Sequence, residues 1–135
     1  MASSIHVLLT DDEELYVEYL AKVLRRRGMK VDTAPDGSRA LSLLAREEYD
    51  VIVLDLRMPG RDGRAALEAI RERDGLTPVI LLTGQMDLDR VTLALKAGAA
   101  EVLLKPCPVE TLVSAIENAN ERKAAAKEVA EREAK

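Results

Sequence analysis

The sequence predicts an α/β domain built around a parallel sheet of five strands, and two observations support this prediction. Short apolar runs alternate with longer amphipathic stretches along the chain, which is typical of successive strand–helix–strand units. Three of the apolar runs consist almost entirely of Val, Ile and Leu, as expected of strands that helices cover on both faces. At 135 residues, the chain has the length of a single domain.

Five segments have the length and composition of strands. Those at 5–9, 51–54 and 78–82 are the most apolar, so we expect them in the middle of the sheet. The segments at 30–34 and 101–104 complete the set of predicted strands.

Five amphipathic helices are predicted between and after these strands. Apolar residues recur at helical spacing from Leu15 to Leu24, and Gly28 follows as a C-terminal stop. The other apolar stripes lie at 41–45 behind the Asp36-Gly37 turn, at 67–70, at 88–95 before Gly98, and at 112–116 behind Pro108.

The end of the chain differs in composition from the rest. After Asn120 the apolar stripe fades into a run of strong helix formers with almost nothing to bury. We therefore expect a flexible N-terminus (1–4), one domain (5–120) and a charged helical extension (121–135). The extension is interpreted as a solvated continuation of the fifth helix, or alternatively as a linker towards an output domain.

Composition and charge argue against several classes of function. A net charge of −4 and an aromatic content of 2% disfavour direct binding of nucleic acid. No apolar run approaches the roughly 20 residues of a membrane helix, and the first residues lack the features of a secretory signal. Cys107 is the single cysteine, so an internal disulfide is impossible, which favours the reducing cytoplasm.

Polar residues follow four of the predicted strands. Asp11 and Asp12 follow the first strand, Asp55 the third, Thr83 the fourth and Lys105 the fifth. The carboxyl ends of parallel strands meet at one edge of a sheet, where ligands of open α/β sheets bind. A single aspartate at such a place is usually a helix N-cap, but agreement among all these strand ends indicates a site.

The residue types at this edge suit a phosphoryl group and a hard cation. Three crowded carboxylates repel one another, and a divalent cation relieves that repulsion. Carboxylate oxygens without a nearby His or Cys suit Mg²⁺, which completes its shell with water and phosphate oxygens. A lysine ammonium and a threonine hydroxyl can both contact a phosphoryl group. The set is therefore suited to placing a phosphoryl group on an aspartate.

Four separated motifs resemble those of the receiver domain of two-component response regulators. They are Asp11-Asp12, Val-Leu-Asp-Leu-Arg-Met-Pro-Gly around Asp55, Thr83-Gly84 and Lys105-Pro106, in this order over roughly residues 5–120. The resemblance implies a flavodoxin-like, doubly wound (βα)5 sheet of strand order 2-1-3-4-5.

The resemblance also implies the chemistry of the acidic residues. Asp55 is the phosphoacceptor, Asp12 binds Mg²⁺ directly, and Asp11 holds a metal-bound water. Asp55 and the backbone carbonyl of Arg57 complete the set of protein ligands. The chain is then not an enzyme for a separate substrate, because it catalyses only its own phosphorylation and dephosphorylation.

Further roles and partners follow from the same resemblance. Thr83 and Lys105 contact the phosphoryl group, and the Lys105-Pro106 peptide is expected to be cis. The implied partners are a sensor histidine kinase or phosphotransfer protein and a downstream target or output domain. A homodimer of this chain that forms on phosphorylation, as in many relatives, is a further implied partner. Neither nucleic acid nor a membrane is expected to bind directly.

Two positions depart from the family pattern. The aromatic residue usually found three residues before the lysine is Val102, and the usual Phe after Lys-Pro is Cys107. Valine has few rotamers and no ring that can swing, so we predict atypical output coupling. Alternatively, Val102 fills space while the loop that begins at Gly84 still moves.

Two further residues are expected to set the lifetime of the phosphorylated state. Arg57 lies two residues after Asp55, and Gln85 lies two residues after Thr83. Both flank the path by which water must approach the acyl phosphate in line, and neither is an obvious base.

Two other classes of function are weighed against a receiver. A haloacid dehalogenase-like phosphatase also uses a strand-end Asp, a Thr, a Lys and Mg²⁺, but it requires a second Asp where this chain has Arg57. A phosphate-independent, receiver-like interaction module has no need of the complete set of Asp11, Asp12, Asp55, Thr83 and Lys105.

Overall fold

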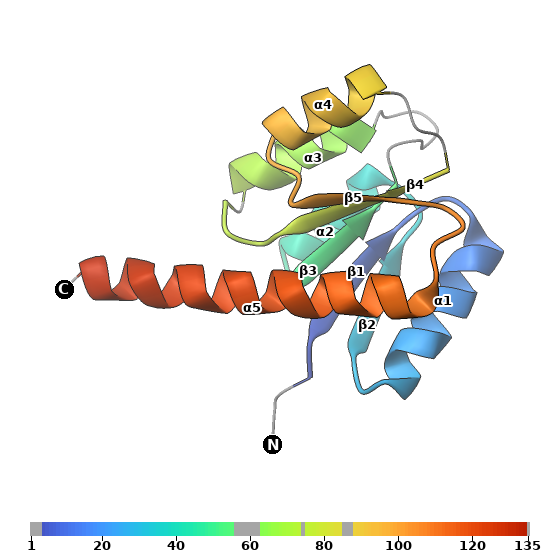
Figure 1. The fold of residues 1–135 in the computed structure, drawn as a ribbon, viewed down its shortest axis with the longest axis horizontal. Coiled ribbons are helices and arrows are strands. Elements are labelled where there is room, and N and C mark those ends of the chain that lie inside the picture. Colours follow the sequence, from blue (N-terminus) through green and yellow to red (C-terminus); the bar gives the residue numbers. More distant parts are fainter. Residues whose placement is uncertain (1–3, 56–62, 74, 85–87, 135) are drawn as a thin grey trace.

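The structure is a computed structural model that describes residues 4–55, 63–73, 75–84 and 88–134. Strands and helices alternate strictly along these residues (Figure 1). The strands are β1 (His6–Thr10), β2 (Lys30–Ala34), β3 (Val51–Leu54), β4 (Val79–Thr83) and β5 (Glu101–Leu104). The helices are α1 (Glu14–Arg26), α2 (Gly37–Leu44), α3 (Gly63–Arg73), α4 (Leu88–Lys96) and α5 (Val109–Glu133).

The strands form one parallel sheet of order β2-β1-β3-β4-β5, which confirms the predicted fold class and strand order. The three most apolar strands, β1, β3 and β4, lie in the middle, as predicted. The edge strand β2 exposes Lys30, and a charged side chain on an edge discourages pairing with another chain.

Two strands end one residue later than predicted. Thr10 pairs with Ala34 in β2 and with Leu54 in β3, and Thr83 pairs with Leu104 in β5. The backbone ladder therefore holds both threonines within the sheet.

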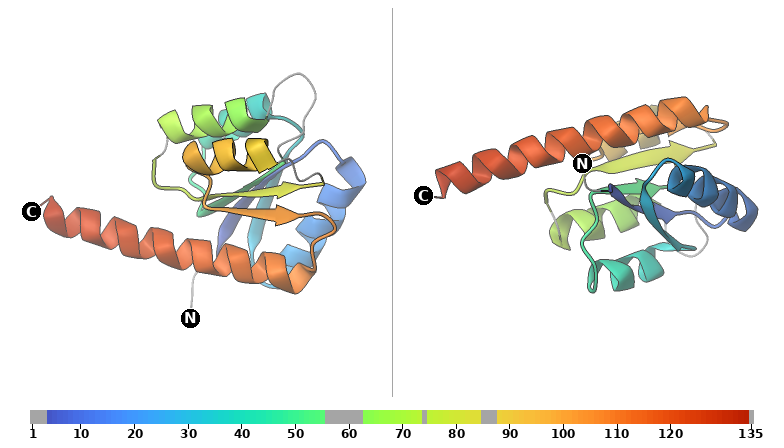
Figure 2. Two further views of the ribbon diagram at one scale, coloured as in Figure 1. Left: turned by 45° about the horizontal axis from the view of Figure 1, so that its top comes forward. Right: turned by 90° about the horizontal axis from the view of Figure 1, so that it is seen from below.

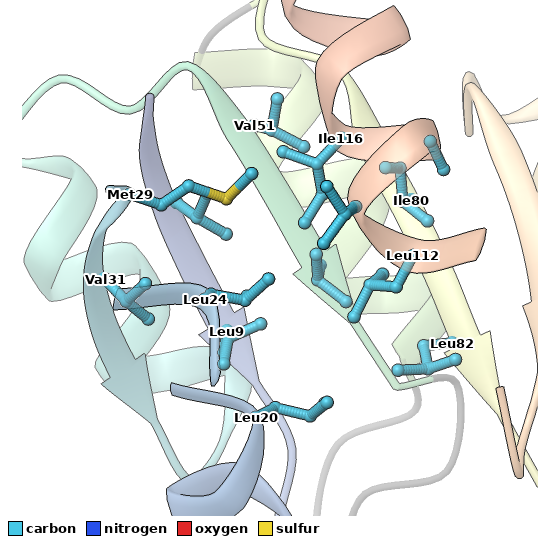
Figure 3. Close-up of a cluster of buried hydrophobic side chains, with 14 of the residues drawn as sticks. Leu9, Leu20, Leu24, Met29, Val31, Val51, Ile80, Leu82, Leu112 and Ile116 are labelled. Carbon is cyan, nitrogen blue, oxygen red and sulfur yellow. The ribbon is translucent and has the colours of Figure 1, made fainter. Parts of the chain in front are cut away.

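Helices cover both faces of the sheet. Helices α1 and α5 lie on one face, and α2, α3 and α4 lie on the other (Figure 2). Successive residues of a central strand alternate between the two cores: Leu9 packs beneath α1 and α5, and Leu8 faces the other helices. Figure 3 shows the first core, in which Leu24 and Ile116 pack on the sheet. Burial of each such side chain stabilises the fold by about 1.5–3 kcal/mol.

The helix ends follow the signals in the sequence. Gly28 and Gly98 adopt φ values of +89° and +110°, so each supplies the left-handed residue that ends a helix. The Asp36 side chain caps α2 by accepting a hydrogen bond of 2.8 Å from the backbone N–H of Arg39.

Helix α5 continues without a break through most of the predicted extension. Residues 124–134 are exposed, and this part of the helix projects past the sheet (Figure 1). Lys123, however, reaches back to the domain, because its Nζ donates to the carbonyl of Tyr49 (2.7 Å) and to Thr77 Oγ1 (3.1 Å). Within the described ranges, no helix combines the length and apolarity needed to cross a membrane.

Candidate functional site

The backbone of the sheet brings the predicted site residues to one edge. The N–H of Asp11 donates to Ala34 (3.0 Å), that of Asp55 to Thr10 (2.9 Å), and that of Lys105 to Thr83 (2.8 Å). These bonds extend the β1–β2, β1–β3 and β4–β5 ladders by one residue. The polar side chains are therefore fixed by the same hydrogen bonds that hold the strands together.

The three aspartates converge at this edge. One carboxylate oxygen from each of Asp11, Asp12 and Asp55 lies within 4.8 Å of the other two. Asp11 and Asp55 are buried, at 8% and 5% exposure, whereas Asp12 is open to solvent. Because carboxylates are seldom buried without compensation, this arrangement points to a binding site.

Lys105 provides the compensating charge. Its Nζ lies 2.7 Å from Asp11 Oδ2, 3.2 Å from Asp55 Oδ2 and 3.4 Å from Glu13 Oε2. Burial lowers the pKa of Lys105, but the hydrogen bond to Asp11 and the charges of Asp11 and Asp55 outweigh it and raise the pKa above its usual value. The lysine is therefore charged at physiological pH.

Glu13 is a member of this cluster that the sequence analysis did not single out. Its carboxylate contacts Lys105, and its backbone N–H donates to Asp11 Oδ1 (2.9 Å). The signal in the sequence was an acidic residue directly after the Asp11-Asp12 pair. The sequence alone does not show that Glu13 belongs to the site, because its partner Lys105 lies in a distant part of the chain.

The Thr83 hydroxyl is buried without a hydrogen-bond partner among the described residues. Leaving a buried hydroxyl unsatisfied costs about 1–3 kcal/mol, so this group is available to a ligand at the edge of the sheet. Gly84 follows it and is exposed, with open space where a Cβ would stand. Arg57 and Gln85, which were also predicted to act here, lie outside the described residues.

The donor set at this edge fits a magnesium ion. Its convergent ligand atoms are carboxylate oxygens, which Mg²⁺ prefers, and the exposed Asp12 leaves one side open to water. A cation at this point would relieve the mutual repulsion of the three convergent carboxylates.

The positions that depart from the family pattern lie on opposite faces of the sheet. Val102 is half-buried in β5 and packs against the core under α3 and α4, opposite Leu81. Cys107 packs against the core under α1 and α5, and burial raises the pKa of its thiol. The Lys105-Pro106 peptide between them is cis, as the resemblance implied.

Similar proteins were found by sequence. Residues 7–117 match the family model of the response regulator receiver domain. The chain is 35% identical over 113 residues to the DNA-binding transcriptional regulator NtrC of Salmonella typhimurium, covering 84% of this chain and 24% of NtrC. It is 37% identical over 114 residues to the transcriptional regulatory protein PrrA of Mycobacterium leprae, covering 84% of this chain and 49% of PrrA. The chain thus spans about a quarter to a half of these relatives.

Solved structures agree with this result. A receiver domain protein from Clostridium thermocellum superposes with a TM-score of 0.86 at 34% identity, covering 90% of this chain and 98% of that one. The receiver domain of the Francisella response regulator 1452 gives a TM-score of 0.81 at 30% identity, covering 88% and 98%. Together with the strand order and the acidic edge, these matches show that the chain belongs to the family of response regulator receiver domains.

Proposed function

We propose that the chain is a switch that accepts a phosphoryl group on Asp55. The observation that carries this proposal is the convergence of buried Asp55 with Asp11, Asp12 and Lys105 at one edge of the sheet. The donor is the phosphohistidine of a sensor histidine kinase or a phosphotransfer protein, and the reaction takes place in the cytoplasm.

The transfer replaces one bond to phosphorus by another. A carboxylate oxygen of Asp55 attacks the phosphorus atom, and the bond from phosphorus to the histidine nitrogen breaks. The imidazole leaves with that electron pair and takes up a proton, so Asp55 carries an acyl phosphate. Lys105, already 3.2 Å from Asp55 Oδ2, pairs with a phosphoryl oxygen, and the unpartnered Thr83 hydroxyl donates to another.

The carboxylates of Asp12 and Asp55 and the backbone carbonyl of Arg57, which lies outside the described residues, would hold a magnesium ion directly, and Asp11 would hold it through a bound water. When bound, Mg²⁺ neutralises the negative charge that develops on the phosphoryl oxygens during transfer. The chain's own part is to hold three carboxylates close together beside one ammonium group.

The signal leaves the site through Thr83 and the loop that follows it. When the Thr83 hydroxyl turns to a phosphoryl oxygen, it moves the end of β4, and Gly84 permits the next backbone angles to change. Val102 has no ring that could follow this movement, so the output differs from that of receivers with an aromatic residue there. A downstream target or output domain then recognises the altered surface of the chain. Formation of a phosphorylation-dependent homodimer is one way in which this surface can act.

Labelling with acetyl phosphate tests this function. Incubation of the chain with acetyl phosphate and Mg²⁺ should add one phosphoryl group, measured by intact-mass spectrometry, and chelation of Mg²⁺ should prevent it. Asp55→Asn should abolish labelling. Asp36→Asn is the matched control, because Asn caps a helix as well as Asp and this residue lies at the start of α2. Labelling that persists in Asp55→Asn would disprove the assignment, and no labelling of the unaltered chain would favour a phosphate-independent module.

A further inference from the structure

We propose that the aromatic ring of Tyr16 positions the Lys105 ammonium at the acidic site. The inference rests on the proposed function, because Lys105 serves the transfer to Asp55. Tyr16 lies on α1, and the Lys105 Nζ stands over its ring at 5.0 Å from the ring centroid. This distance is within the roughly 6 Å over which the negative face of an aromatic ring attracts a cation.

The ring offers Lys105 a partner that does not change during the reaction. The ammonium is held by Asp11 and Asp55, which are the same carboxylates that would take the cation and the phosphoryl group. An aromatic face carries no formal charge and does not compete as a metal ligand. It therefore keeps Lys105 Nζ over the site while the carboxylates exchange partners.

Tyr16 is itself held firmly enough to act in this way. It packs against the core under α1 and α5, and its hydroxyl is buried without a hydrogen-bond partner among the described residues. Burial raises the pKa of the Tyr16 phenol although the charge of Lys105 opposes the shift, so the phenol stays neutral. A leucine at this position would fill the space but would offer no aromatic face to the ammonium.

This aromatic residue is distinct from the one that the family usually carries on β5. Val102 occupies that position and packs on the opposite face of the sheet from Tyr16. Tyr16 therefore acts from α1 through Lys105, as a positioning residue.

Two substitutions separate the ring from its bulk. Tyr16→Phe keeps the ring and should label Asp55 with acetyl phosphate within twofold of the unaltered chain. Tyr16→Leu removes the ring and should slow labelling three- to tenfold, which is about 0.6–1.4 kcal/mol at 1.36 kcal/mol per tenfold. The control is Tyr19→Leu, on the same helix but 54% exposed, which should leave the rate unchanged.

A fluorinated series tests the electrostatic nature of the contact. Phenylalanine carrying one, two or three fluorines at position 16 keeps its shape while the ring face loses negative charge, so the logarithm of the rate should fall in step with fluorination. If the labelling rate did not change with fluorination, or if Tyr16→Leu were labelled as fast as the unaltered chain, the inference would be overturned. The proposed function would remain intact.

A second measurement remains informative if the proposed function fails. NMR of the Lys105 Cε group in the unphosphorylated chain should show a ring-current shift that Tyr16→Leu removes and Tyr16→Phe restores. If the unaltered chain takes no phosphoryl group, the proposed function is wrong. An unchanged Lys105 Cε shift in Tyr16→Leu would show that the ring does not position Lys105.

Discussion

Asp11 and Asp55 are buried carboxylates that both contact the Lys105 ammonium. The Lys105 charge contributes to the stability of the fold, because it offsets the repulsion between two buried carboxylates. A cation at the same carboxylates can take over this role, so the stability of the domain and the occupancy of its site are linked.

Loss of the Lys105 charge is predicted to destabilise the domain and to make it depend on magnesium. Lys105→Met should lower the free energy of unfolding by about 1.5–3 kcal/mol, the value of hydrogen bonds to charged groups. Urea unfolding measures this, and added Mg²⁺ should restore part of the loss. Lys96→Met, at an exposed position on α4, serves as the control and should change stability by less than about 0.5 kcal/mol.

A second cluster, at the amino ends of the strands, gives a prediction for pH dependence. Asp32 Oδ2 accepts a hydrogen bond from the Tyr49 hydroxyl (2.7 Å) and lies 3.1 Å from His6 Nε2. Burial raises the pKa of Asp32, but the bonds to Tyr49 and His6 outweigh it and leave the pKa below its usual value. The folded state therefore binds this proton less tightly than the unfolded state does.

The Asp32 contribution should be present at neutral pH and lost in acid. It is complete above the unfolded pKa of about 3.9 and disappears as the pH falls through the lower pKa of the folded state. Asp32→Asn should therefore be less stable than the unaltered chain at pH 7, and the difference should shrink below pH 4. Urea unfolding at pH 7, 4 and 3 measures it. A difference that stays constant over this range would count against a lowered pKa of Asp32 in the folded state.

At the scale of elements, α5 is held at two places. Leu112 and Ile116 pack its first turns on the sheet, and Lys123 ties a later turn to the segments that enter β3 and β4. Contacts between α5 and the rest of the domain therefore continue as far as Lys123, and residues 124–134 are exposed.

Loss of the Lys123 contact is predicted to loosen the later turns of α5. Lys123→Met removes the 2.7 Å donor of the Tyr49 carbonyl, which keeps its 3.3 Å bond from Thr77 Oγ1, and should cost about 0.5–1.5 kcal/mol of unfolding free energy. Amide exchange should quicken in residues 121–133 by more than in the first turns of the helix. Lys127→Met, one turn further along and exposed, is the control. Equal exchange in the two variants would show that Lys123 does not anchor the helix.

The elements and the site were predictable to different degrees. The strands could be located from runs of Val, Ile and Leu, and the site from the rule that polar strand ends meet at one edge. The contacts of Glu13, Tyr16 and Lys123 were not predictable, because each depends on a partner far away in the sequence. Glu13 and Tyr16 both contact Lys105, which comes from the distant end of β5, and Lys123 lies 74 residues from Tyr49.

In the whole molecule, the two ends of the parallel strands carry different groups of contacts. The carboxyl edge carries the acidic site, and the amino edge carries the Asp32 cluster and the attachment of α5. Because the acidic site is assembled only in the folded state, ligands that bind there should stabilise the entire domain.

Magnesium is predicted to raise the stability of the domain according to its affinity. At a Mg²⁺ concentration one hundred times the Kd, the free energy of unfolding should rise by about 2.7 kcal/mol. Asp12→Asn should need more Mg²⁺ for the same gain, while Asp36→Asn should behave like the unaltered chain. Thermal unfolding at increasing Mg²⁺ measures the effect. If Asp12→Asn and the unaltered chain gave identical unfolding temperatures at every Mg²⁺ concentration, Asp12 would not be a magnesium ligand.

The most direct test of the central claim is to locate the phosphoryl group on the chain. Treatment of the acetyl phosphate-labelled chain with borohydride reduces an acyl phosphate to an alcohol, so a phosphorylated aspartate is read as homoserine in the peptide mass spectrum. We expect homoserine at position 55 alone, only when Mg²⁺ is present during labelling. Homoserine at Asp11 or Asp12, or a label that borohydride leaves in place on His6, would contradict the assignment of Asp55 as the phosphoacceptor.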